Sequence, residues 1–445
     1  MKSLAIAAMF VSTSVNLARA DESAAEVPDN QPPAVEKPDR EITMRGYFLS
    51  RFQYVPTRHD AVLYPLLDVE KFQGFLEGNL DLTIKSERYT FRSDTSALYR
   101  VSPAGCRAGS DVPACLVINE LYLTYDVIPD KVSVLVGRHR PSWGAALSLH
   151  PVEPMNPQPD PTDPSFQRLG AWTAMVEASA EHHVATVGWF PNVTNSIAGT
   201  PKGVSGGLVG GRYRWSPEHF DVSAIGFYDL DTQLPEAGTS GSMVVGESNF
   251  EIHGEALVHK RREIKTGTLQ KGTCPVRSLG IPLREVWDYS GIFGTRWDGG
   301  GGTLVNFEYM HVGDGMVGSD FRAVLNTADL LSQMCPDGRL EANDVSQDGR
   351  PSQFSSTFLR RNYLILSGFK PSFGEDGRLA KLGASATILA GLDDTSGVAT
   401  ARLQYTLEDT TVVRLGGLAT FGGARTQYGI LPFHSIILVD VQTLF

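Results

Sequence analysis

Apolar and polar residues alternate with a period of two from about residue 41 to the end of the chain, and this pattern constrains the fold strongly. In the stretch 76–84, LEGNLDLTI, aliphatic residues occupy even positions and polar residues odd ones, and 401–407, ARLQYTL, repeats the pattern on the opposite parity. Side chains of a strand point alternately to its two faces, so the pattern predicts strands with one apolar and one polar face. The 45 glycines and 26 prolines fit many strands separated by turns.

Two folds accommodate such strands: a soluble sandwich with its apolar faces inside, or a membrane barrel with its apolar faces toward lipid. Hydrophobic residues make up only 42% of the chain, and no apolar run beyond the N-terminus approaches the roughly 18 residues of a spanning helix. No change of composition divides the chain into domains, so a single sandwich of this length would be unusually large. The aromatic residues gather near strand ends, on the same parity as the apolar residues. We therefore expect an all-β, antiparallel transmembrane barrel.

The final strand, VDVQTLF, ends on the aromatic residue Phe445. It resembles the C-terminal recognition strand of bacterial outer-membrane proteins, which their assembly machinery reads. Thr443 departs from that pattern, which prefers a bulky apolar residue two positions before the end. The resemblance implies that Phe445 is an assembly signal and that the partners include the barrel-assembly machinery, outer-membrane lipid and lipopolysaccharide.

The N-terminus has the features of a secretory signal: Lys2, an apolar stretch from Leu4 to about Val15, and small residues at the end. We expect cleavage after Ala20, which would remove two cations and take the formal charge from −11 to −13. Residues 21–40 are rich in proline and charge, which predicts a flexible periplasmic segment before a barrel at 41–445. The acidic balance argues against nucleic acid as a partner.

The alternation predicts eighteen strands, with sixteen as the alternative count. The candidates are 42–54, 74–86, 88–101, 116–127, 131–138, 170–180, 183–190, 207–216, 219–228, 242–248, 250–260, 286–297, 303–311, 357–369, 379–391, 398–407, 410–420 and 432–445. Short and long links alternate between them, as expected for short periplasmic turns and long extracellular loops. The predicted long links include 139–169, 229–241, 261–285 and 312–356.

The four cysteines fall in predicted external loops, and an oxidising envelope favours disulfides there. Cys106 and Cys115 share one loop, whereas Cys274 and Cys335 lie on two loops that flank a hairpin. We expect these two pairings. Four free thiols or a metal site are the alternative, although neither spacing resembles a zinc motif.

A resemblance to a known family rests on one long predicted loop, GRHRPSWGAALSLHPVEPMNPQPDPTDPSFQRLGAW. The residues that carry it are, in order, Trp143-Gly144, Asn156-Pro157, Asp160-Pro161, Asp163-Pro164 and Arg168. The loop resembles the first large loop of poorly characterised porin-like outer-membrane barrels, a broad group that includes alginate-export-like proteins, and FEIHGEAL at 250–257 resembles the same group. The resemblance implies a channel whose loop 141–169 folds into the lumen and narrows it. The alternative is an ordinary exposed loop. Porin-like barrels are often trimers, so a homotrimer is possible.

Charged residues on the polar parity are candidates for the lumen wall, because a charge facing lipid at mid-membrane would cost about 2–4 kcal/mol. Fixed charges in a lumen select which solutes pass, although they could equally form a structural network. The candidates are Arg45, Arg51, Glu77, Asp81, Glu120, Arg212, Arg214, Glu251, His253, Glu255, Arg296, Glu308, Arg360, Arg402 and Arg414.

The sequence therefore predicts a passive, porin-like channel for a small or oligomeric hydrophilic solute, without cofactor or metal. A surface adhesion or ligand-binding barrel with a closed lumen is the alternative. An outer-membrane hydrolase acting through His253 is a third, although no GxSxG, HExxH or GxxxxGK[ST] motif occurs.

Overall fold

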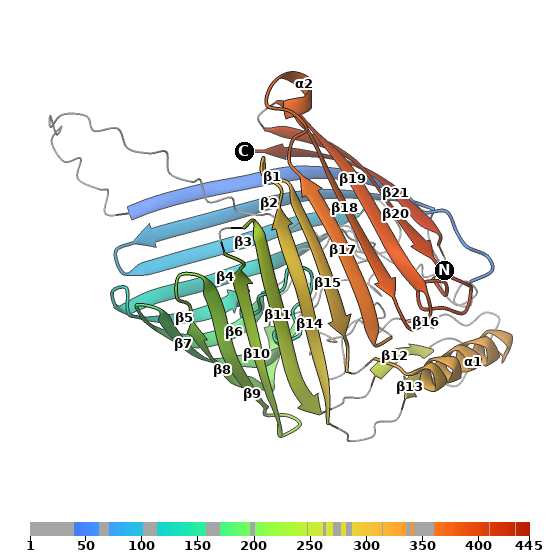
Figure 1. Ribbon diagram of the computed structural model, residues 1–445, viewed down its shortest axis with the longest axis horizontal. Helices are drawn as coiled ribbons and strands as arrows, with labels where there is room; N and C mark the ends of the chain where they lie inside the picture. The colour runs from blue at the N-terminus through green and yellow to red at the C-terminus, as the bar shows by residue number, and fades with distance from the viewer. Residues whose placement is uncertain are drawn as a thin grey trace.

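A computed structural model describes residues 40–61, 71–100, 114–156, 170–195, 201–246, 248–260, 264–269, 277–281, 287–313, 315–334, 340–341, 360–408, 410–431 and 433–445. Figure 1 shows its strands curving around a closed barrel. One sheet of 18 antiparallel strands forms the barrel wall, and the pairing of the first strand with the last closes it. The transmembrane barrel predicted from the sequence is confirmed, with its strand count.

The wall strands follow chain order, each paired with the next. They are β1 (Arg40–Tyr54), β2 (Phe72–Ser86), β3 (Tyr89–Arg100), β4 (Ala114–Ile128), β5 (Val132–His139), β6 (Ala171–Ala180), β7 (His183–Asn195), β8 (Pro201–Trp215), β9 (Phe220–Asp229), β10 (Leu234–Val244), β11 (Phe250–Lys260), β14 (Trp287–Asp298), β15 (Leu304–His311), β17 (Asn362–Lys370), β18 (Leu382–Gly391), β19 (Ser396–Glu408), β20 (Thr411–Phe421) and β21 (Ser435–Leu444).

Alternate residues of each strand face opposite sides of the wall, and the two sides differ as the sequence pattern predicts. On β1, Phe48 and Phe52 are exposed on the outer side, whereas Arg51 and Gln53 are buried on the inner side. Apolar side chains thus face outward and polar ones inward, the reverse of a soluble core. The same arrangement occurs on β19 and β20, where Leu403 and Leu415 are exposed outward. An outward apolar surface suits hydrocarbon, as in transmembrane barrels.

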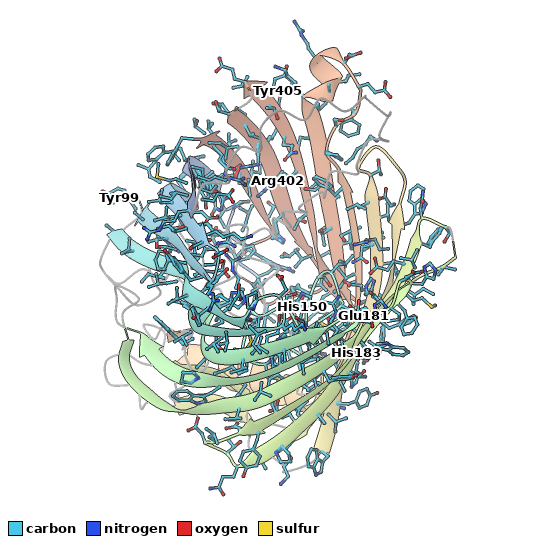
Figure 2. All side chains as sticks on the ribbon, turned by 90° about the vertical axis from the view of Figure 1, so that its left-hand side faces the viewer. Tyr99, His150, Glu181, His183, Arg402 and Tyr405 are labelled. Carbon is cyan, nitrogen blue, oxygen red and sulfur yellow. The ribbon has the colours of Figure 1, made fainter. Side chains whose placement is uncertain are left out.

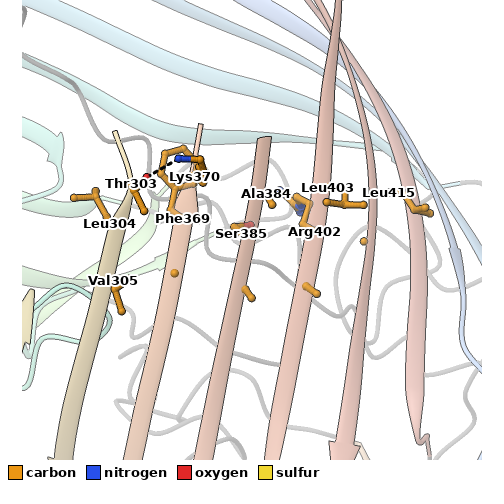
Figure 3. A pocket seen from close by; sticks show the side chains of 14 residues that line it. Thr303, Leu304, Val305, Phe369, Lys370, Ala384, Ser385, Arg402, Leu403 and Leu415 are labelled. Carbon is orange, nitrogen blue, oxygen red and sulfur yellow. Dashed lines mark hydrogen bonds between the residues drawn. The ribbon is translucent and has the colours of Figure 1, made fainter. Parts of the chain in front are cut away.

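A pocket of about 490 Å³ lies against β15, β17, β18, β19 and β20, toward the end of the barrel that carries the link 299–303. Leu403 and Leu415 help to line it, and at its edge Nζ of Lys370 donates a hydrogen bond to Oγ1 of Thr303 over 2.9 Å (Figure 3).

The two ends of the barrel differ in their links. We call the end with the links 87–88, 129–131, 181–182, 216–219, 245–249, 299–303, 371–381 and 409–410 the short-turn end. The opposite end, the long-loop end, carries the links 140–170, 261–286 and 312–361, among others. The link 371–381 holds the helix α2 (Gly377–Ala380).

One predicted strand was misplaced. The strand expected at 242–248 is β10, at Leu234–Val244, so the predicted long link 229–241 is a tight turn of residues 230–233. The Asp229 carboxylate stabilises this turn by accepting hydrogen bonds from the amides of Asp231 and Thr232. The pattern failed because outward positions of β10 hold Pro235, Ala237 and Gly241 rather than bulky apolar residues.

Two predicted loops contain regular structure. The strands β12 (Ile264–Leu269), β13 (Arg277–Ile281) and β16 (Leu340–Glu341) form a separate small sheet, and α1 (Gly318–Met334) lies in the link after β15. Among the described residues, neither helix has the length and hydrophobicity needed to cross a bilayer.

Residues 1–39 lie outside the described part of the chain, so the signal and the flexible segment stay predictions. Cys115 is disulfide-bonded and lies at the start of β4 rather than in a loop. Cys106, Cys274 and Cys335 lie outside the described residues, so both pairings also stay predictions.

Candidate functional site

The link after β5 enters the barrel. We call residues 140–156 the inward segment, because its atoms bond to inner-face side chains of strands far around the wall. Oγ of Ser240 on β10 donates to the carbonyl of Trp143 over 2.9 Å, and a guanidinium nitrogen of Arg212 on β8 donates to the carbonyl of Ser142 over 3.0 Å. Figure 2 shows His150 of this segment in the interior of the barrel.

Two carboxylates of the wall hold the middle of the inward segment. Glu255 on β11 accepts the amide of Ala146 at 2.7 Å, and its Oε1 lies 3.0 Å from Nδ1 of His150. Glu308 on β15 accepts the amide of Leu147 at 2.8 Å and the hydroxyl of Ser148. Both carboxylates are fully buried, with side-chain exposures of 0%. Charge-assisted hydrogen bonds of this kind offset the cost of burying the carboxylates.

His253 supports Glu308 from the wall rather than facing solvent. Its Nε2 lies 2.9 Å from Oε1 of Glu308, and its side chain is 0% exposed. The sequence prediction placed Glu255, His253 and Glu308 on the inner face, which agrees with their contacts. Their described partners are the inward segment and one another.

The inward segment also stabilises itself. The Glu153 carboxylate accepts the amides of Trp143 and Gly144 at 2.7 and 2.9 Å. Nδ2 of Asn156 donates to the carbonyl of Pro141 at 2.7 Å and to Glu153 at 2.8 Å. Of the residues predicted for a constriction, Trp143 and Asn156 therefore have defined roles in the shape of the segment. Asp160, Asp163 and Arg168 lie outside the described residues.

Apolar side chains of the inward segment pack in two directions. Trp143 stacks on Phe227 with 5.3 Å between ring centroids and meets Phe190 edge-on at 5.6 Å. With Val152 and Met155 it joins a buried cluster of inner-face residues from β5 to β11. Ala146 and Leu149 instead join a second cluster, whose wall residues come from β14 to β21.

A second link contributes to that other cluster. Tyr428 and Phe433, from the link between β20 and β21, are buried in it. Gln427 fixes this link, because its side chain accepts the Tyr363 hydroxyl at 2.7 Å and its amide donates to Asp394 at 2.7 Å.

Asp393, beside Asp394, ties the long-loop end of β17 to the turn between β18 and β19. Burial opposes its ionisation, but hydrogen bonds from the Asn362 side chain and from the amides of Arg361 and Asn362 outweigh that effect and lower the pKa of Asp393. The ionised carboxylate of Asp393 is therefore the form that accepts these hydrogen bonds.

A polar network lines the inner face of β2 to β4 beside the start of the inward segment. Arg92 lies 3.1 Å from Asp81 and 3.5 Å from Glu120, while Arg140 of the segment lies 3.2 Å from Asp94. The predicted residues Asp81 and Glu120 thus belong to one ion-pair network.

A second charged group lies on the inner face where the barrel closes. Arg51 pairs with the buried Asp440 at 2.9 Å across the seam between β1 and β21. Arg402 and Arg414 both interact electrostatically with Asp440 and with Arg51. The structure thus brings three predicted arginines around one carboxylate.

The remaining predicted charges are dispersed. Arg214 pairs with Asp221, and Arg296 pairs with Glu251 at 2.6 Å, both near the short-turn end. Glu77 accepts the Tyr47 hydroxyl at 2.7 Å, and Arg45 is exposed near the start of β1.

Arg360 departs from the prediction that it lies within a strand. It precedes β17 at the long-loop end, where its guanidinium lies 5.0 Å from the ring centroid of Phe321 on α1. The predicted strand 357–369 began too early, because residues 360 and 361 bend before the ladder starts.

Several interacting residues were missed by sequence reasoning. Arg92, Asp94 and Asp440 lie on the polar parity of predicted strands, so the alternation could have identified them. Arg140, His150 and Glu153 lie in the inward segment, where no periodic pattern marks them.

The described residues hold no group of three or more His, Cys, Asp and Glu side chains arranged to bind a metal ion. The carboxylates around the inward segment are instead engaged by amides, hydroxyls and histidines. Chemically, this interior can restrict and orient a polar solute by charge and shape.

No family model matches the sequence, and no curated protein matches it. The fold does match solved structures. The chain is similar to the outer-membrane protein opdK of Pseudomonas aeruginosa, with a TM-score of 0.52, 10% identity, and coverage of 91% of this chain and 99% of that one. OccAB1 of Acinetobacter baumannii matches with a TM-score of 0.52, 10% identity, and coverage of 90% and 96%.

OccK8 (OprE) of Pseudomonas aeruginosa matches with a TM-score of 0.51, 10% identity, and coverage of 90% of this chain and 98% of that one. Identities this low compare the fold alone. The chain therefore has the fold of a porin-like bacterial outer-membrane β-barrel.

Proposed function

We propose that this chain is a porin-like channel of the bacterial outer membrane, through which a small or oligomeric hydrophilic solute diffuses passively. The observation that carries the proposal is the inward segment, held inside an 18-strand barrel by Glu255 and Glu308 of the wall. A barrel of this size is wide enough for an aqueous passage, and a segment fixed inside it would set the width of that passage.

The charged inner face supports diffusion of a polar solute. Arg92, Arg140 and their carboxylate partners lie beside the inward segment, and Arg51, Arg402 and Arg414 surround Asp440 at the seam. Fixed charges at a narrow point discriminate among solutes by charge and by hydrogen bonding. No driving reaction is required, because the solute moves down its own gradient.

The closed-lumen adhesion or binding barrel is a second candidate, and the two apolar clusters inside the barrel favour it. The hydrolase is disfavoured, because the side chain of His253 is 0% exposed and lies against Glu308. Assembly by the barrel-assembly machinery, contact with lipopolysaccharide and a homotrimeric state remain part of the proposal.

Planar-bilayer recording of the purified full-length protein separates the candidates. A channel gives stepwise current increases whose size grows with salt concentration. Silent bilayers, with protein that retains a compact, heat-modifiable band on electrophoresis, would instead support the closed barrel. Swelling of protein-loaded liposomes in sugars of increasing size then measures the width of the passage.

A further inference from the structure

The interior is divided into a packed part and a polar part. On the packed part, the inner-face side chains of β7 to β11, including Phe190, Ile225 and Leu257, are buried together with Trp143 and Val152. The inner faces of β14 to β18, including Ile292 and Ile365, are buried with Ala146 and Leu149, and the long-loop halves of β19 to β21 join the same cluster through Val398, Leu418 and Ile436. Glu255, His253 and Glu308 lie between these two clusters and are themselves fully buried.

The remaining sector of the wall is polar throughout; Ser96 and Asn119 in its middle are buried, but its charged residues toward the short-turn end are partly exposed. On β2, β3 and the inward segment, the side chains of Asp81, Arg92 and Arg140 are 30%, 35% and 34% exposed. Across the seam, Arg402 and Arg414 are half-buried on the inner face of β19 and β20. Charged groups that are partly exposed inside a barrel mark where water has access.

The inward segment separates the two parts. Its apolar residues Trp143, Leu149 and Val152 face the packed walls, whereas Arg140 at its base pairs with Asp94 on the polar wall. The segment therefore packs apolar side chains against one part of the barrel and places the charged side chain of Arg140 against the other.

We infer that the aqueous route is offset to one side of the barrel, along the inner faces of β1 to β4 and the short-turn halves of β19 to β21. This inference rests on the proposed channel function and locates its route. Arg92, Arg140 and Arg414 would then be the residues that meet a passing solute. Glu255, His253 and Glu308 would act as positioning residues, which hold the inward segment without touching the solute.

Cysteine substitution tests the location of the route. Thr83→Cys on β2 and Gln404→Cys on β19 introduce thiols at half-buried inner-face positions of the polar sector. Ser223→Cys on β9 is the matched control: Ser223 also lies on the inner face near the short-turn end, but it is buried. A membrane-impermeant methanethiosulfonate reagent is added during bilayer recording, and the response of the unsubstituted protein to the reagent serves as baseline.

An offset route predicts loss of single-channel current upon modification of Thr83→Cys and Gln404→Cys, with no loss for Ser223→Cys. Loss in all three variants, loss in Ser223→Cys alone, or loss in none would overturn the inference while the channel function stood. Absence of current from the unsubstituted protein would overturn the proposed function instead. The mass increase of each folded variant after reagent treatment reports thiol access independently of conductance.

Discussion

Single buried carboxylates determine where the inward segment lies. Glu308 accepts a backbone amide and a hydroxyl from the segment and also contacts His253, all without exposure to solvent. Buried polar groups that lose such a partner retain their desolvation cost, which is about 1–3 kcal/mol for a neutral group. The position of the inward segment therefore depends on one side chain, Glu308, which lies on a strand far away in the sequence.

Glu308→Gln is expected to loosen the inward segment, because the amide keeps the shape of the side chain but loses its charge and one acceptor. We expect greater open-channel current noise and a loss of about 1–3 kcal/mol in unfolding free energy. Bilayer recording and urea unfolding in detergent measure the two effects. Glu251→Gln is the control, since Glu251 pairs with Arg296 on the same inner face. Equal noise in the two variants would argue against the anchoring role.

At this scale the sequence identified residues but not their partners. Glu255 and Glu308 were predictable as inner-face charges, because strand alternation is a local property. Their contacts were not predictable, because Leu147 and Glu308 are 161 residues apart in the chain. Nothing local in the sequence specifies which wall a segment will meet after it enters the barrel.

At the scale of elements, the seam between β1 and β21 depends on a glycine. Gly46 and Phe445 exchange backbone hydrogen bonds of 3.0 Å in both directions, and the Phe445 ring lies 5.2 Å from that of Phe48. A Cβ atom on Gly46 would lie 2.4 Å from the Phe445 ring and 2.5 Å from the carbonyl oxygen of Asn79. The missing side chain thus makes room for the terminal aromatic residue.

Gly46→Ala is therefore expected to weaken barrel closure, at the roughly 1–3 kcal/mol typical of overpacking. The measurement is the temperature at which the compact band is lost on electrophoresis, and it should fall. Gly78→Ala on the neighbouring strand is the matched control, because its Cβ would meet Phe48 at an ordinary 3.4 Å. A similar fall in temperature for both variants would show that any glycine replacement in these strands destabilises the barrel, and that the space for the Phe445 ring is not the cause.

Strands were more predictable than the links between them. Consistent alternation along a segment locates a strand, but β10 was misplaced because outward positions of this strand hold Pro235 and Gly241. The helix α1 was also missed, because it lies in a stretch that the alternation assigned to a long link; among its described side chains, Phe321 and Leu325 are buried. Local pattern therefore finds strands whose outward face is uniformly apolar and misplaces or misses elements that lack such a face.

At the scale of the whole molecule, a wall one strand thick separates a polar interior from an apolar outer surface. On β19, Arg402 is half-buried inside the barrel while its neighbour Leu403 is 49% exposed outside. A shift of one residue in register would place the guanidinium in hydrocarbon and the leucine in the lumen. The outward apolar surface of the entire barrel must therefore be matched by lipid.

Leu403→Arg and Leu407→Arg test this orientation as a pair. Both leucines face outward on β19 with similar exposures of 49% and 50%, but Leu403 lies near the middle of the strand and Leu407 one residue from its end. A charge facing lipid should cost about 2–4 kcal/mol at mid-membrane and about 0–1 kcal/mol near an interface. Denaturant titration of folding into lipid vesicles measures both values. Equal costs, or none, would mean that this face does not lie in hydrocarbon, and the channel proposal would fail with it.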